Sequence, residues 1–317
     1  MDATNPNIQP NEQDEILRFA FANGDIRGVA ATVDQSWQRS IAQHDYPPVV
    51  TELLGQSLAA AACMVAGLKF DGRLVLQFSA GGPLSLLVVQ MRSDYSFRVT
   101  AKCDPAFAWQ DRALTPADLL QQGQLVLTLE PVKGQAYQSV VGVQAQGDPH
   151  AALAEAIEGY FANSEQLPTR LVLAANAARA CAIMTQRMPQ SGGRPAAGDA
   201  FDYAVAVLDT AVGVAGRQEL LDTSLTTMLH RLFHEQNPRL LAVESLRFVC
   251  QCSRQRVGSM LAGLGAQELN AALDESPTPG QIEIRCEFCN TPYHFDQVDI
   301  GQLLAQAGVA PPGGTRH

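Results

Sequence analysis

Short apolar runs alternate with polar positions along the middle of the chain, in the pattern of β-strands. Residues 73–80 (RLVLQFSA), 84–91 (LSLLVVQM) and 95–102 (YSFRVTAK) each fit a strand, and Gly81-Gly82-Pro83 is typical of a turn between the first two. These three segments predict an antiparallel meander. Further strands are predicted at 124–130, 137–144, 169–175 and near 180–188.

Two predicted helices interrupt these strands. The first runs from about 49 to 68, and the second from about 149 to 163, where Asp148 is a suitable N-cap and the apolar residues recur at helical spacing. Helices placed between runs of strands favour an α+β fold. We therefore predict a strand-rich α+β domain over residues 1–189.

A change of pattern follows at residues 189–199 (PQSGGRPAAGD), whose Gly, Pro and Ser content predicts a linker or an exposed loop. After it the apolar spacing becomes helical, with one stripe from Phe201 to Val212 and another from Leu225 to Phe233 behind a possible Ser224 cap. Residues 190–240 are thus predicted to be a helical linker. Its apolar stripes need a surface to cover them.

The last predicted unit, residues 241–317, has few apolar residues for a firm core but holds four cysteines in two close pairs. Cys250 and Cys252 form a CxC pair, and Cys286 and Cys289 form a CxxC pair after 33 intervening residues. Four thiolates in this arrangement match one tetrahedral Zn²⁺, which supplies folding energy to such small modules. The sequence therefore predicts a zinc site at these four residues.

Local sequence supports both halves of the predicted site. The CxxC pair lies between the apolar segments 282–284 and 293–295, which predicts a zinc knuckle on a hairpin. The CxC pair precedes a helix that Ser253 could cap and Gly265 could end, and the helix dipole would favour Cys252 as a thiolate. The long spacer is interpreted as a loop extension between this helix and the knuckle.

The same residues leave open whether the site is structural or redox-active. A disulfide between residues two apart closes only a tight ring, and strained disulfides are labile. Four arginines close to the cysteines in sequence could keep the sulfurs anionic, or they could be solvated surface charges: Arg247, Arg254, Arg256 and Arg285. Together these features favour a redox-active site over a purely structural one.

Charge and motifs exclude several other classes of function. The net charge is −10, and residues 230–317 carry no Lys, so nucleic-acid binding is not expected. Motifs of hydrolases and of phosphate-binding loops are lacking, and the protein is predicted not to be an enzyme. The first fifteen residues do not fit a secretory signal and the longest apolar run, 58–68, is short for a membrane span, which predicts a cytoplasmic protein without a membrane anchor.

The remaining potential ligands are assigned no chemistry. With four thiolates available, the three nearby histidines are expected to be surface or packed residues: His230, His234 and His294. The isolated cysteines are expected to be small buried thiols: Cys63, Cys103 and Cys181.

The chain resembles the 33-kilodalton heat-shock protein family of redox-regulated bacterial chaperones. The CxC and CxxC pairs carry the resemblance, together with stretches such as 160–170 (YFANSEQLPTR) and 250–256 (CQCSRQR). The resemblance implies a reduced, zinc-bound and inactive form. Oxidation would form the disulfides Cys250–Cys252 and Cys286–Cys289, release Zn²⁺ and unfold the linker and the zinc unit.

The oxidised form is then expected to dimerise and to hold unfolding client proteins without ATP, both through the domain of residues 1–189. It would pass these clients to an ATP-dependent chaperone system, protecting against oxidative stress and heat. The 33-residue spacer is slightly longer than is usual in the family, which puts the activation threshold in doubt. Two alternatives remain: a constitutive binding module held by zinc, and a thiol-disulfide oxidoreductase, although the latter typically has one CxxC at the start of a helix.

Overall fold

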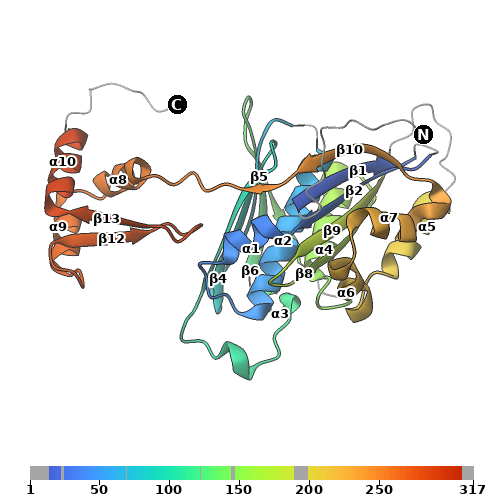
Figure 1. Cartoon of the computed structure of the whole chain (residues 1–317), viewed down its shortest axis with the longest axis horizontal. Coiled ribbons are helices and arrows are strands. Elements are labelled where there is room, and N and C mark those ends of the chain that lie inside the picture. The colour runs from blue at the N-terminus through green and yellow to red at the C-terminus, as the bar shows by residue number, and fades with distance from the viewer. Residues whose placement is uncertain are drawn as a thin grey trace. The chain divides into compact units, whose positions relative to one another are not determined.

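The computed structural model describes residues 14–22, 25–68, 70–121, 123–143, 147–188 and 199–308. It divides into two compact units, Met1–Val249 and Cys250–His317 (Figure 1). The sequence instead predicts functional boundaries at residues 189 and 240, and that three-part division remains a prediction.

A six-stranded sheet contains the predicted meander. Its order is β11-β5-β4-β3-β6-β7, and its pairings are antiparallel apart from the short parallel pair of β11 with β5. The strands are β3 (Gly72–Ala80), β4 (Leu84–Arg92), β5 (Ser96–Cys103), β6 (Gly123–Pro131), β7 (Tyr137–Val141) and β11 (Arg247–Phe248).

A second sheet of five antiparallel strands has the order β10-β1-β2-β9-β8. Two of its strands were predicted, and three were not recognised in the sequence: β1, β2 and β10. The strands are β1 (Asp14–Ala20), β2 (Ile26–Val33), β8 (Thr169–Ala175), β9 (Ala180–Arg187) and β10 (Arg239–Ser245).

The predicted long helix is α2 (Pro48–Gly67), which contacts strands of both sheets and is buried from Val50 to Ala66 apart from Glu52. It is long and apolar enough to cross a membrane, but its side chains lie inside the first unit, as in the core helix of a globular domain. Smaller helices complete this part of the fold: α1 (Gln35–Ile41), the turn Trp109–Asp111, α3 (Pro116–Leu120), α4 (Ala152–Tyr160) and the π-helical turn Phe161–Glu165.

The predicted cap of α4 is wrong. The N-cap is Ala151, whereas Asp148 lies in the preceding turn, where its carboxylate accepts a hydrogen bond from the backbone N–H of His150 at 3.0 Å. The other carboxylate oxygen of Asp148 pairs with Arg217. Asp148 therefore ties this turn to a later helix instead of starting α4.

Three helices cover the face of the five-stranded sheet that α2 does not occupy. They are α5 (Asp199–Asp209), α6 (Val214–Asp222) and α7 (Leu225–Phe233), followed by the turn His234–Gln236. Ser224 caps α7 as predicted, with its Oγ accepting from the N–H of Thr227. A separate apolar core joins these helices to the sheet, with Leu208 and Phe233 packed against Leu17 and Phe19. The predicted apolar stripes thus rest on the strand domain.

The second unit contains two helices, a hairpin and a last helix: α8 (Arg254–Ala262), α9 (Ala266–Asp274), β12 (Gln281–Arg285), β13 (Pro292–Asp296) and α10 (Gln297–Gly308). Gly265 does not end the first helix: α8 stops at Ala262, and Gly265, with φ of 91°, is the N-cap of α9. Part of the spacer that was interpreted as a loop is therefore helical. Only six apolar side chains of the described residues form the buried core: Leu261, Leu269, Leu273, Ile282, Phe295 and Ile300.

Candidate metal centre

The four predicted cysteines come from two backbone segments of the second unit. Cys250 and Cys252 lie in the extended residues before α8, which begins where the Oγ of Ser253 accepts a hydrogen bond from the N–H of Arg256 at 3.2 Å. Cys286 and Cys289 lie in the turn between β12 and β13. The structure thus brings both predicted pairs to one place.

The turn of the CxxC pair has the form of a knuckle. The N–H of Asn290 donates to the carbonyl of Cys286 at 2.8 Å, and the N–H of Cys286 donates to the carbonyl of Thr291 at 3.0 Å. Asn290 adopts the left-handed conformation with φ of 53°, which Asn tolerates better than most residues. The predicted hairpin is confirmed, and both sulfurs of this pair lie within 4.8 Å of the CxC sulfurs.

The sulfur positions suit one small ion. The Sγ atoms of Cys250 and Cys286 are 3.6 Å apart, those of Cys252 and Cys289 are 3.4 Å apart, and all four lie within 4.8 Å of one another. A tetrahedral zinc site with bonds of about 2.3 Å has sulfurs separated by about 3.8 Å. The donor set and its spacing are therefore compatible with a zinc site.

Two hydroxyl groups lie next to the sulfurs, and neither was predicted from the sequence as a neighbour of the site. The hydroxyl of Tyr293 donates to the Sγ of Cys252 at 3.0 Å, and the Oγ1 of Thr291 lies 3.1 Å from the Sγ of Cys289. Both residues closely follow the CxxC pair in the sequence. This position in the knuckle hairpin is the feature from which their contact with the sulfurs could have been predicted. Hydrogen bonds from such neighbours orient metal ligands and favour the anionic sulfur.

The cysteine pKa values differ within the cluster. Burial raises the pKa of Cys250 and of Cys252. At Cys289 burial also acts to raise the pKa, but hydrogen bonds, above all with Thr291, lower it to about 7. Burial of the Cys252 sulfur thus acts against the thiolate that the helix dipole is predicted to favour, and that prediction is not confirmed.

The nearby arginines have other partners, which favours the interpretation as structural or surface charges. Arg254 pairs with Asp299 at 2.6 Å and lies over the ring of Phe295, while Arg285 pairs with Glu283 at 2.7 Å. The remaining two also bond elsewhere: Arg247 to Asp94, and Arg256 to the carbonyl of Gln251.

The other potential ligands lie outside the cluster. Within the described residues, the four cysteines are the only group that could hold a metal ion. His294 lies on β13, where it faces Glu283 at 3.6 Å, and His230 stacks on His234 in the first unit. The isolated thiols of Cys63, Cys103 and Cys181 are buried or half-buried. Burial raises their pKa values, to about 11 for Cys103 and about 12 for Cys181.

We expect Tyr293→Phe to weaken metal binding by about 10- to 100-fold, because the Cys252 sulfur loses its hydrogen-bond donor while the hairpin keeps its packing. Competition with a chromogenic chelator measures this affinity. Tyr203→Phe is the matched control, since it removes a hydroxyl that bonds Glu235 in the first unit. Equal affinities in the two variants would show that the Tyr293 hydroxyl does not support the site.

Comparisons with known proteins all point to one family. A family model described as Hsp33 protein matches residues 14–296. The 33 kDa chaperonin of Ectopseudomonas mendocina (strain ymp) is 40% identical over 303 residues, which cover 95% of this chain and 98% of the relative. The 33 kDa chaperonin of Pseudomonas aeruginosa (strain LESB58) is 39% identical over 307 residues, which cover 97% and 100%.

The fold has a counterpart among solved structures. The crystal structure of the 33 kDa chaperonin (HSP33) of Thermotoga maritima matches with a TM-score of 0.76 over 93% of this chain and 98% of the other, at 19% sequence identity. That likeness confirms the predicted α+β fold, and the four clustered cysteines are consistent with the predicted small C-terminal zinc unit. Because the family model and the two relatives span nearly the whole sequence, the chain belongs to the Hsp33 family of chaperones.

Proposed function

We propose that this chaperone is switched on by oxidation, through loss of a zinc ion bound by Cys250, Cys252, Cys286 and Cys289. The observation that carries the proposal is the position of the four sulfurs in a unit whose described core has only six buried apolar side chains. So small a core needs a metal or a disulfide to stay folded. Chemistry at the sulfurs therefore controls whether the second unit folds.

Oxidation removes the ligands. Each disulfide forms when two thiols give up two electrons and two protons, so two disulfides consume two equivalents of a two-electron oxidant such as hydrogen peroxide or hypochlorite. The family resemblance implies the pairs Cys250–Cys252 and Cys286–Cys289. With no thiolate left, the unit loses metal-linked stability of roughly 10–16 kcal/mol and unfolds.

The helices α5, α6 and α7 are the second part of the proposed switch. They hide an apolar face of the five-stranded sheet that includes Leu17, Phe19 and Ile183. Their release would expose that face and their own apolar stripes, and a large exposed apolar surface binds unfolded chains. We propose this released state as the form that holds clients.

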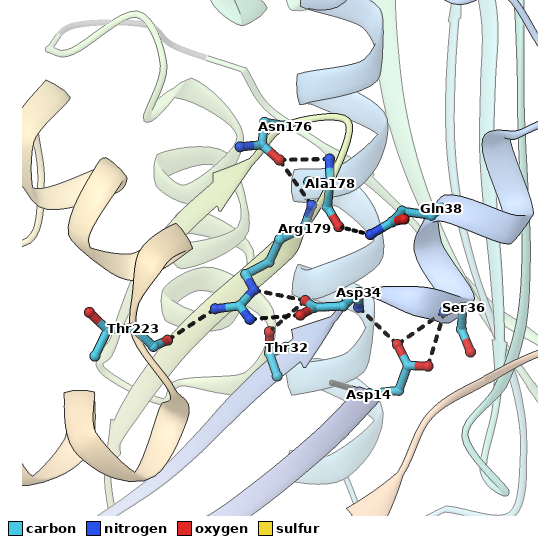
Figure 2. A network of polar contacts seen from close by, with 9 residues as sticks. All are labelled: Asp14, Thr32, Asp34, Ser36, Gln38, Asn176, Ala178, Arg179 and Thr223. Carbon is cyan, nitrogen blue, oxygen red and sulfur yellow. Dashed lines mark hydrogen bonds and ion pairs between the residues drawn. The ribbon is translucent and has the colours of Figure 1, made fainter. Parts of the chain in front are cut away.

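The polar contacts at one end of α6 support the proposal that this helix packs reversibly on the strand domain. Figure 2 shows the Arg179 guanidinium bound to both carboxylate oxygens of Asp34, at 2.8 and 2.6 Å, while a third N–H donates to the carbonyl of Thr223 at 3.2 Å. Asp34 is held in turn through its N–H by Asp14 of β1 at 2.8 Å. One arginine thus links the end of α6 to the strand domain through a single hydrogen bond.

Ion pairs hold the end of α5 and the first turn of α6. Arg170 on β8 reaches Glu158 at 3.0 Å and Asp209 of α5 at 2.6 Å, and Arg217 of α6 pairs with Asp148. Burial and the charge of Glu158 act in opposite directions on Arg170, and its pKa is raised overall. These few polar links join helices that otherwise depend on one apolar face, which suits a segment that must detach.

The remaining parts of the proposal follow from the family. The oxidised protein dimerises, holds partly unfolded clients without ATP and passes them to an ATP-dependent chaperone system in the cytoplasm, under oxidative stress and heat. It acts by binding and not as an enzyme. Its net charge of −10 disfavours nucleic acid as a partner.

The test follows zinc, thiols and client aggregation together during oxidation. We expect one Zn²⁺ to leave as four thiols disappear, and suppression of light scattering by a heat-unfolding client to rise in parallel. Mass spectrometry of the unreduced protein assigns the disulfides. Equal suppression by the reduced and oxidised forms would instead support a constitutive zinc-bound binding module, and turnover of a disulfide substrate would support an oxidoreductase.

A further inference from the structure

The residues directly before Cys250 form one edge of each sheet in the first unit. We call residues 239–249 the strap. Its first part, β10, pairs antiparallel with β1 from Glu15 to Ala20, and its last part, β11, pairs with β5 (Figure 1). Without the strap, β1 would present an unpaired row of N–H and C=O groups, which is a template for another extended chain.

Backbone hydrogen bonds hold the strap more than side-chain burial does. Beyond the ladders, the N–H of Leu246 donates to the carbonyl of Asp14 at 3.0 Å, and the N–H of Val249 donates to that of Phe97 at 2.9 Å. Leu246 is the one fully buried side chain of the strap, whereas Leu240 and Leu241 are 57% and 63% exposed. Such a segment is replaceable by any chain that offers the same backbone.

In contrast to the strap, the neighbouring strand β1 is well packed through its apolar side chains. Ile16 of β1 belongs to the core around α2, and Leu17 and Phe19 belong to the core under α5–α7. When α5–α7 detach, β1 still packs through Ile16 on the core around α2 and still pairs with β2, so it keeps its shape when its outer edge is uncovered. A rigid strand with a weakly packed cover is the arrangement that strand addition requires.

We propose that the β1 edge is a client-binding site, which an extended apolar segment of an unfolding protein enters by strand addition after the strap has left. This inference rests on the proposed function, because unfolding that starts at Cys250 frees the strap at Val249. The strap acts as the resident occupant of the site in the reduced protein. Recognition through the backbone also suits clients of unrelated sequence.

Hydrogen exchange of the full-length protein tests the site directly. We expect the amides of residues 14–20 to be protected in the reduced protein, to exchange at least about tenfold faster after oxidation, and to regain protection when a thermally unfolded client such as citrate synthase is bound. Redox-dependent suppression of aggregation without this return of protection would overturn the edge site and leave the proposed switch intact. Suppression that is independent of oxidation would instead contradict the switch.

A competing peptide provides the second readout. A peptide with the strap sequence RLLAVESLRFV should displace client from the oxidised protein, and a peptide with prolines at the positions of Ala242 and Val243 should not. Successive N–H groups point to opposite edges of a strand, so one of the two prolines removes a donor toward β1. Equal competition by both peptides would exclude strand addition. Protection of β1 that rises with protein concentration and without client would assign the edge to a second copy of the chain and overturn the client assignment.

Discussion

Replacing Cys286 by Ser is expected to leave the second unit unfolded in the reduced protein. A serine hydroxyl is a poor zinc ligand, and a site with three thiolates and no fourth ligand loses most of the roughly 10–16 kcal/mol that a structural zinc ion contributes. The six buried apolar side chains of this unit cannot replace that contribution. Elemental analysis should give about one Zn²⁺ per wild-type chain and close to none for Cys286→Ser.

Two further variants make this experiment specific. Cys286→His keeps a zinc ligand and should retain much of the bound metal, while Cys103→Ser removes a thiol of the first unit and should not alter the zinc content. Hydrogen exchange of residues 250–308 reports folding separately from metal. If Cys286→Ser lost its zinc but kept these amides protected, the view that the metal holds the unit together would be wrong.

Phe233→Ala is expected to give a protein that suppresses client aggregation without any oxidant. Phe233 is completely buried, with its ring centroid 5.2 Å from that of Phe21 and 5.9 Å from that of Phe19. Truncation of such a side chain costs about 3–5 kcal/mol, which is large for helices held by one apolar face and a few ion pairs. The helices should detach while the sheet beneath them stays folded.

Light scattering of a heat-unfolding client, in the presence of a reductant, measures the expected gain. Val214→Ala, on the neighbouring helix α6, removes an apolar side chain that is 80% exposed and should leave the reduced protein inactive. Hydrogen exchange of residues 199–233 shows whether the helices have opened. A variant with opened helices and no gain in activity would exclude this apolar face as a client surface.

The sequence predicted the strands that lie between clear turns, but it missed β1, β2 and β10. β1 carries Asp14, Glu15 and Arg18 among its apolar residues, so it shows no simple alternation. The structure explains these charges: Asp14 accepts hydrogen bonds from the N–H groups of Asp34 and Ser36, and Arg18 faces Glu244 of β10 at 3.4 Å. Such tertiary partners are not visible in a local pattern.

At the metal centre, the two cysteine pairs were sufficient to predict which side chains come together, because few alternatives place four thiols in a unit with so little core. Spacing could not identify the Tyr293 hydroxyl as the partner of Cys252, since this contact depends on how the hairpin folds against the CxC segment. For the same reason, the sequence could not show that burial raises the pKa of Cys252.

The burial of α2 has a consequence for how this chaperone is itself made. On the ribosome, α2 leaves the exit tunnel before the strands β4, β8 and β9 that will cover it, and β9 ends roughly 120 residues later. At about 5–20 residues per second, a helix apolar enough to span a membrane waits roughly 6–24 s until β9, the last of these strands, is complete. During its own synthesis, the nascent chain therefore exposes the kind of apolar segment that the finished protein protects in others.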